Sequence, residues 1–149
     1  MRAMRRTLAV AMLLALAACS RVVALPSAVV RIDTADGPVR IHAEVAETDA
    51  ARSRGLAGRT SLAPGEGMAF VTDHPVDDAF WMKRTAIPLS VAFWGRDGRI
   101  TAMFDMAPCG HGPCRRYRPA RPYVGAVEVT RGYLASRGVE VGDRVVLVR

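Results

Sequence analysis

Apolar and polar side chains alternate within residues 39–46, and this pattern constrains the fold more than any other feature of the chain. The apolar members are Val39, Ile41, Ala43 and Val45, and the polar members between them are Arg40, His42 and Glu44. Successive side chains of a strand point to opposite faces of its sheet, so a period of two places one set inward and the other toward solvent. Residues 39–46 are therefore predicted to form a half-buried β-strand.

Further short runs of β-branched and aromatic residues are bounded by turn residues and predict a chain made mainly of strands. We expect these additional strands at residues 28–32, 67–71, 79–83, 89–94, 99–106, 123–130 and 144–148. The sequence Gly-Arg-Asp-Gly at 95–98 favours a tight hairpin turn, because Asp-Gly and an extra glycine tolerate positive φ.

Two short helices are also expected. One covers residues 49–56 with Thr48 as its N-cap, and the other covers 131–137, with Thr130 before it and Gly138 in a left-handed conformation after it. The chain shows no internal repeat and no second domain. We therefore predict a mainly β (α+β) fold in one compact domain: a strongly bent sheet, a sandwich or a partly closed barrel, with the helices over an open end or edge.

The first 18 residues have the pattern of an export signal. Arg2, Arg5 and Arg6 precede an apolar run of eleven residues at 8–18, which is too short to span a bilayer. The sequence Leu-Ala-Ala-Cys at 16–19 resembles the lipobox of bacterial lipoproteins, in which the sulfur of the cysteine carries the lipid. This reading gives a signal peptide at 1–18, a tether at 19–27 and a domain at 28–149; ordinary cleavage after Ala17 or Ala24 is the alternative.

Lipidation at Cys19 would make the membrane a partner of the mature protein, through an N-terminal anchor. Ser20 follows the cysteine, and it is not the aspartate that usually retains lipoproteins at the inner membrane. By resemblance to that sorting rule, we expect the periplasmic face of the outer membrane.

Charge does not point to a nucleic acid partner. The whole chain carries a formal charge of +7, and removal of the three signal arginines leaves 18 basic and 14 acidic residues, a net charge of +4. No series of aromatic residues is interleaved with the basic ones to stack on bases. We expect no binding of nucleic acid, and no motif predicts a cofactor.

Several ordered motifs resemble the family called domain of unknown function 192. They are RGL at 54–56, RTSLAP at 59–64, GEGM at 65–68, FWMK at 80–83, IPL at 87–89 and DGRI at 97–100, followed by Pro108-Cys109, Cys114, Tyr117, Glu128 and GDRV at 142–145. The resemblance covers residues 30–149 and implies a compact, mainly β domain, but it implies no established activity. The family usually shows Asn after FWMK and Asp after IPL, whereas this chain has Arg84 and Ser90.

Cys109 and Cys114 enclose a short loop that an oxidising compartment allows to be bridged, and we predict a disulfide between them. The alternative is a metal site in which both thiolates and His111 are ligands. That site would need a further ligand from His42 or His74, and neither is near the loop in sequence, so no metal is expected.

The FWMK motif supplies candidate ligand-binding residues. A period of two places Trp81 and Lys83 on one face, where Trp81 would be a stacking surface and Lys83 would contact an anion or a hydroxyl group. Arg84 is grouped with them. In the alternative, Trp81 packs beneath a helix and the Lys83 ammonium extends to water.

Glu66 is a further candidate, because it lies between two glycines directly before a strand. Its carboxylate would contact a ligand or act as a general base; alternatively, it accepts hydrogen bonds from backbone N–H groups of the turn. A hydrolase of the glycosidase type would need a second carboxylate. The candidates for that partner are Asp73, Asp77, Asp78 and Glu128.

The densest basic cluster of the domain follows the cysteine loop and consists of Arg115, Arg116, Arg118 and Arg121. It would contact anionic envelope material, or it is simply a solvated loop.

Together these features favour a non-enzymatic, lipid-anchored envelope module. It would bind a small polar or anionic ligand, or a protein, in a cleft bordered by Glu66, Trp81, Lys83 and the arginine-rich loop. The alternative is a small hydrolase that acts on an envelope polymer through Glu66 and a second carboxylate. In a third hypothesis, an accessory protein pairs an exposed strand edge with its partner.

Overall fold

The computed structural model describes residues 24–110 and 112–149. The predicted signal peptide, the lipidation site at Cys19 and His111 lie outside the described residues. In the described part of the chain, no helix is both long and apolar enough to cross a membrane.

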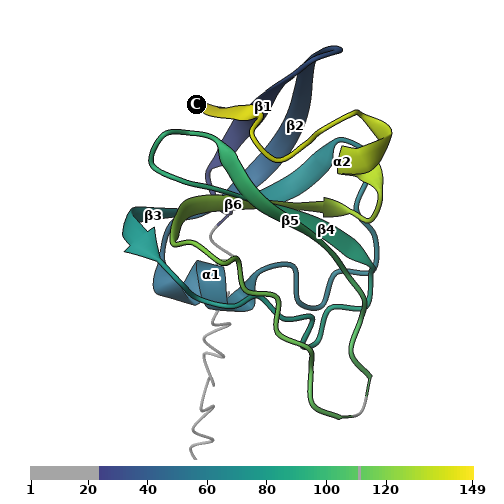
Figure 1. The fold of residues 1–149 in the computed structure, drawn as a ribbon. Helices are drawn as coiled ribbons and strands as arrows, with labels where there is room; N and C mark the ends of the chain where they lie inside the picture. Colours follow the sequence, from purple (N-terminus) through teal and green to yellow (C-terminus); the bar gives the residue numbers. More distant parts are fainter. Residues whose placement is uncertain (1–23, 111) are drawn as a thin grey trace, which may run out of the picture.

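Between Leu25 and Arg149, with residue 111 left aside, seven strands and two short helices follow one another (Figure 1). Their bounds are β1 (Ser27–Thr34), β2 (Gly37–Ala46), α1 (Asp49–Arg54), β3 (Glu66–Val76), β4 (Leu89–Trp94), β5 (Ile100–Met106), β6 (Tyr123–Thr130), α2 (Tyr133–Ser136) and β7 (Arg144–Val148). The strand predicted at 39–46 is confirmed as most of β2, and its alternating residues differ in burial as expected.

All seven strands belong to one sheet, in the order β5-β4-β6-β3-β2-β1-β7. Neighbouring strands run antiparallel except β2 and β3, which are parallel and are connected through α1 and the turn that follows it. A parallel pair cannot be joined by a tight turn, so this crossover places α1 at one end of the sheet.

The two edge strands meet at one end of the sheet. Arg99 and Arg144 form an antiparallel bridge, the Ile100 amide donates to the Asp143 carbonyl at 2.9 Å, and the Val145 amide donates to the Gly98 carbonyl at 2.7 Å. The sheet is therefore curled into a half-barrel with two short helices, which confirms the predicted mainly β fold.

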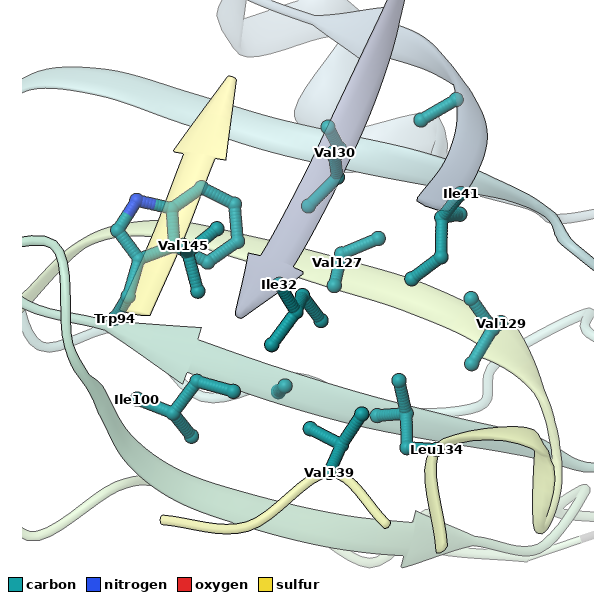
Figure 2. Packing of buried hydrophobic residues seen from close by; sticks show 13 residues of the cluster. Val30, Ile32, Ile41, Trp94, Ile100, Val127, Val129, Leu134, Val139 and Val145 are labelled. Carbon is teal, nitrogen blue, oxygen red and sulfur yellow. The ribbon is translucent and has the colours of Figure 1, made fainter. Parts of the chain in front are cut away.

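The concave face of the sheet encloses the first hydrophobic core (Figure 2). Side chains from β1, β2, β4 and β6 meet Leu134 of α2 and Val139 there, so the short helix closes the open side of the barrel. Trp94 lies across from Gly125 in the register of β4 and β6, and the indole occupies the space that a side chain at position 125 would need.

The convex face carries the second core, which is covered by α1 and by the loops 77–88 and 107–122. Its centre is a group of aromatic rings in edge-to-face contact: the ring centroids of Phe70 and Phe80 are 4.9 Å apart, those of Phe80 and Phe93 are 4.9 Å apart, and those of Phe93 and Tyr123 are 4.8 Å apart. Such contacts add about 0.5–1.5 kcal/mol per pair beyond burial of area. They anchor the loops that form the candidate site.

Two local predictions are corrected. Residues 79–83 do not form a strand; Met82 is buried and Trp81 exposed, as the alternation predicts, but the only ladder contact is a single bridge between Phe80 and Tyr117. No neighbouring strand is available there, since the segment crosses over the convex face rather than lying beside the sheet. In addition, Gly132, not Thr130, caps α2, because β6 continues to Thr130.

Three turn predictions are confirmed. Thr48 caps α1 by accepting a hydrogen bond from the Ala51 amide at 3.2 Å. Gly138 follows α2 with a φ of 68°, and the turn at residues 95–98 joins β4 to β5, with Gly98 at a φ of 72°.

Candidate functional site

A cleft with a volume of about 930 Å³ opens on the convex side. One wall is formed by α1 and the residues just before it, and a second by the C-terminal half of β3. The third wall combines residues of the loop 78–85 with Arg116 and Arg118. This volume lies within the range of small-molecule sites, roughly 300–1,000 Å³.

An exposed tryptophan stands on the loop wall. Trp81 is 43% exposed, and the Arg116 guanidinium lies 4.4 Å from the centroid of the Trp81 ring. Lys83 lines the same cleft. The structure therefore brings two of the predicted ligand-binding residues together with part of the arginine-rich loop; Arg115 instead lies over the ring of Tyr117.

Backbone pairing holds this wall in place. Phe80 and Tyr117 exchange two backbone hydrogen bonds of 2.9 Å, one residue before Trp81 and one residue after Arg116. Both anchoring rings belong to the second core. The stacked pair thus projects from a fixed point rather than from two independent loops.

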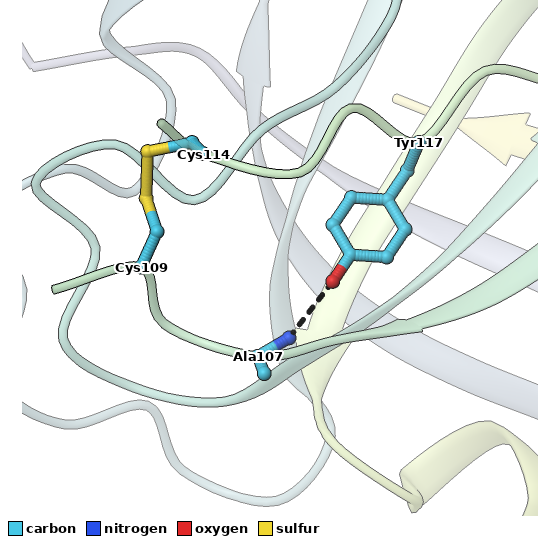
Figure 3. The surroundings of a disulfide bond; sticks show 4 residues. All are labelled: Ala107, Cys109, Cys114 and Tyr117. Atoms are coloured by element: carbon cyan, nitrogen blue, oxygen red, sulfur yellow. Dashed lines mark hydrogen bonds between the residues drawn. A yellow bond between two sulfur atoms is a disulfide. The ribbon is translucent and has the colours of Figure 1, made fainter. Parts of the chain in front are cut away.

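The predicted disulfide between Cys109 and Cys114 is present in the structure, with Cα atoms 5.3 Å apart (Figure 3). The Ala107 amide donates to the Tyr117 hydroxyl at 3.3 Å, so the two arms of the loop are joined a second time, outside the ring closed by the disulfide. Both sulfur atoms are used in this bond and are not available as thiolate ligands. Within the described ranges, no group of three or more His, Cys, Asp or Glu side chains is arranged to hold a metal ion.

Two other cations of the cleft are already engaged. Arg52 of α1 pairs with Asp49 and donates to the Val71 carbonyl at 2.9 Å, and Arg118 pairs with Asp77 at 3.2 Å. By contrast, neither Lys83 nor Arg116 makes an ion pair with any residue in 24–110 or 112–149. On the wall that carries Trp81, an anionic group could therefore contact these two cations without displacing an existing pair; Arg54 of α1, on another wall, makes no ion pair in the described residues either.

Glu128 lies at the base of the cleft, on the central strand β6. It is only 5% exposed, and its carboxyl makes no hydrogen bond to any described residue. Burial raises the pKa of this carboxyl to about 8. In the sequence, Glu128 is only one of four candidates for a second carboxylate; the signal that distinguishes it is its position as the lone carboxylate of an otherwise apolar strand.

Tyr123 lines the same cleft as Glu128. Its hydroxyl donates a hydrogen bond of 3.3 Å to the Asp78 carbonyl, which fixes the ring. Burial, and next the Asp78 carboxylate, raise the pKa of the Tyr123 phenol above its ordinary value. The phenol therefore stays neutral and is a packing and hydrogen-bonding group.

Glu66 is not part of this cleft. It begins β3 beside His42, it is exposed, and it lines a different cavity together with Glu44 and Arg59. Its carboxylate accepts from the Ala63 amide at 3.4 Å, which is the turn-capping alternative. Of its candidate partners, Asp73, Asp78 and Glu128 line the first cleft, whereas Asp77 pairs with Arg118.

Comparison with known proteins places this arrangement in a family. The model of the family DUF192, described as "Uncharacterized ACR", matches residues 30–147. The chain belongs to the DUF192 family. The resemblance seen in the motifs is thereby confirmed, and the family description carries no activity. Among curated proteins, none matches the chain.

Two solved structures similar to this DUF192 protein cover most of its length. A "putative transcription regulator" from Sinorhizobium meliloti 1021 is 28% identical with a TM-score of 0.77, and the match covers 84% of this chain and 96% of that one. A protein of unknown function from Novosphingobium aromaticivorans DSM 12444 is 31% identical with a TM-score of 0.78, covering 85% and 89%. The half-barrel is thus shared beyond this chain.

Arg84 and Ser90, the two residues that differ from the usual DUF192 pattern, each have a structural role. Arg84 has a φ of 61°, the one non-glycine residue with positive φ in the described chain, and its carbonyl accepts from the Gly58 amide at 2.9 Å. Asparagine tolerates this conformation better than arginine, so the usual Asn has a backbone reason. Arg84 is exposed and does not line the cleft.

Ser90 is buried and also has a structural role. Its hydroxyl donates to an Asp105 carboxylate oxygen at 2.5 Å and accepts from the Gly132 amide at 2.9 Å, directly before α2. An aspartate at position 90 could accept from Gly132 alone. In this chain the Ser90 hydroxyl accepts from the Gly132 amide, and the Asp105 carboxylate accepts from that hydroxyl.

Proposed function

We propose that this DUF192 protein is an exported envelope module that binds a small polar ligand carrying an anionic group in the cleft of Trp81. Anchoring through a lipid on Cys19, at the periplasmic face of the outer membrane, is part of the proposal. The lipobox-like sequence at 16–19 supports the anchor.

The observation that carries the binding proposal is the grouping of Trp81, Arg116 and Lys83 on one wall. Trp81 is 43% exposed and lines the cleft, so it offers an aromatic surface to a bound molecule, as aromatic side chains commonly do in small-molecule sites. Two cations without an ion-pair partner in the described chain stand beside it, and guanidinium and ammonium groups bind carboxylates and phosphates. A ring or acyl portion of the ligand would then lie against the indole.

Tryptophan fluorescence can test this proposal directly, because Trp81 and the buried Trp94 are the two tryptophans of the chain. The full-length protein in detergent micelles would be titrated with glycerol 3-phosphate, a muropeptide and glucose 6-phosphate, with neutral N-acetylglucosamine as the comparison. We expect a saturable change in emission with an anionic probe. The change should be lost in Trp81→Phe and weakened in Lys83→Gln.

Arg121→Gln is the matched control, since Arg121 is exposed and does not line the cleft. A response that persists in Trp81→Phe would contradict the proposed site. So would the lack of a response to every anionic probe.

Labelling cells with radioactive palmitate tests the anchor. Incorporation that disappears in Cys19→Ala supports lipidation, and a wild-type chain that takes up no label contradicts it.

A hydrolase acting on an envelope polymer is the second candidate function. The observation that favours it is that a carboxyl kept protonated near neutral pH, Glu128, shares a cleft with the carboxylates of Asp73 and Asp78. Release of reducing ends from purified cell-wall polymer, abolished by Glu128→Gln, would support this function. Binding of the polymer fragments without turnover would exclude them as its substrates.

A further inference from the structure

We infer that Glu128 is a ligand-contact residue whose carboxyl accepts a hydrogen bond from the inner end of the bound molecule. The ligand class is then a small molecule with an anionic group at one end, for Lys83 and Arg116, and an amine or hydroxyl donor at the other. This inference rests on the proposed function and adds the second half of the recognition site.

The first support is the lack of a partner in a buried position. Glu128 retains 5% exposure, and no side-chain or backbone donor among residues 24–110 and 112–149 bonds to its carboxyl. Buried polar groups in folded proteins are nearly always hydrogen-bonded, because burial without a partner costs about 1–3 kcal/mol even for an uncharged group. The Glu128 carboxyl has no such internal partner in the described chain and keeps its remaining exposure toward the cleft, so a donor on a bound molecule can reach it.

The second support is the direction from which that partner can come. The residues opposite Glu128 on the two adjacent strands are Met68 of β3 and Val91 of β4, which are both buried and offer no donor from their side chains. The adjacent backbones are close as well, since a Cβ added at Gly67 would lie 2.4 Å from the Glu128 carbonyl oxygen. The cleft is the open side of this residue.

A second polar side chain of the cleft, that of Thr85, also lacks a hydrogen-bond partner among the described residues. Thr85 is 8% exposed and lines the cleft, and its hydroxyl makes no hydrogen bond to the described part of the chain. Leu56 and Phe70, which are also buried, add apolar surface to the lining of the same cleft. A few convergent polar groups on an apolar base are the usual composition of a small-molecule site.

Whether Glu128 loses its proton on binding distinguishes a hydroxyl donor on the ligand from an ammonium donor. Burial alone holds its pKa near 8, so the carboxyl is mostly neutral at pH 7. The other charged or titratable groups that line the cleft come from every wall: Glu47, Asp49, Arg52, Arg54, Asp73, His74, Asp78, Lys83, Arg116, Arg118 and Tyr123. A hydroxyl donor leaves Glu128 neutral, whereas an ammonium group favours the carboxylate and releases a proton to the buffer.

Calorimetric titration of the full-length protein in detergent micelles at pH 7 tests the inference. Glucose 6-phosphate and glucosamine 6-phosphate share the phosphate and differ in a hydroxyl or an amine. Each is titrated in two buffers of different ionisation enthalpy, which gives the number of protons released. We expect wild type to bind at least one probe, and Glu128→Met, which removes the acceptor, to weaken binding of that probe at least tenfold. The amine should release more protons than the hydroxyl, and this excess should be absent from Glu128→Met, since the phosphate contributes equally to both probes.

Glu44→Met is the matched control, because Glu44 pairs with Arg59 in the other cavity. Circular dichroism verifies that Glu128→Met is folded. If Glu128→Met binds the probes as wild type does, the role of Glu128 is overturned while the proposed function stands. If wild type binds neither probe, while an anionic probe still changes Trp81 emission, the two-ended ligand class is wrong; if no probe binds by either method, the proposed function falls with it.

Discussion

Phe80 and Tyr117 exchange two backbone hydrogen bonds, each 2.9 Å long, and so join two loops that are far apart in sequence. Trp81 follows the first of these residues and Arg116 precedes the second, which places the guanidinium over the indole. The candidate binding wall is therefore built on one bridge over the second core. Anything that loosens either loop should disturb the stacked pair.

The disulfide between Cys109 and Cys114 closes part of the loop that carries Tyr117, and it should stabilise the protein. In the chain-entropy model, closing a loop of about six residues lowers the conformational entropy of the unfolded chain and so raises its free energy by about 2 kcal/mol. We expect the double variant Cys109→Ser/Cys114→Ser to lose about that much free energy of unfolding in urea titrations. Reduction of wild type should reproduce the loss, and unchanged stability in both cases would contradict a stabilising role.

Arg84 should be a site where a single substitution stabilises the fold. Its φ of 61° is strained for arginine, and asparagine tolerates this region more easily. We expect Arg84→Asn to raise the free energy of unfolding by about 0.5–1 kcal/mol, and the melting temperature by about 2–5 °C. Arg121→Asn removes a charge at an exposed position without positive φ and should change neither value; an equal gain there would show that charge, not backbone strain, is responsible.

The general fold followed from the sequence because strand periodicity and turn chemistry are local. The alternation within residues 39–46 and the Asp-Gly turn at 97–98 each depend on a few neighbours, and both were predicted correctly. The order of the strands depends on contacts between distant segments, so the parallel pairing of β2 with β3 could not be derived. The strand expected at 79–83 failed for the same reason, since alternation does not reveal whether a partner strand exists.

The candidate site was predicted in part. Trp81 and Lys83 line the same cleft and Met82 between them is buried, which is the division that the two-residue period predicted, although Lys83 lies in a turn and not in a strand. Glu66 lies apart from them because it is the first residue of β3, whereas the cleft is lined by later residues of that strand. The position of Glu128 at the base required the register of β6 between β3 and β4, which no local pattern encodes.

Gly125 should be intolerant of even the smallest side chain. A Cβ at this position would lie 2.2 Å from an indole carbon of Trp94, which fills the first core. We expect Gly125→Ala to cost about 1–3 kcal/mol, with a red-shifted Trp94 emission as the ring is displaced. Gly110→Ala is the control, because nothing lies within 4 Å of its added Cβ; equal losses in the two variants would show that the contact with Trp94 is not the cause.

Glu128 should make the protein less stable as the pH rises. The unfolded carboxyl loses its proton near pH 4.5, whereas burial keeps the folded one protonated up to about pH 8. Between these values the folded state binds more protons than the unfolded state, so its advantage shrinks with rising pH and stays constant above about 8. At about 1.4 kcal/mol for each pH unit, the loss is on the order of 5 kcal/mol. Glu128→Gln cannot titrate, and its free energy of unfolding, measured in urea between pH 5 and pH 8.5, should fall less steeply than that of wild type. Parallel curves for the two proteins would mean that Glu128 is ionised in the folded state, with a partner that compensates its charge. A variant that gains relative stability at high pH while it loses ligand binding would show that this buried carboxyl is retained for recognition rather than for folding.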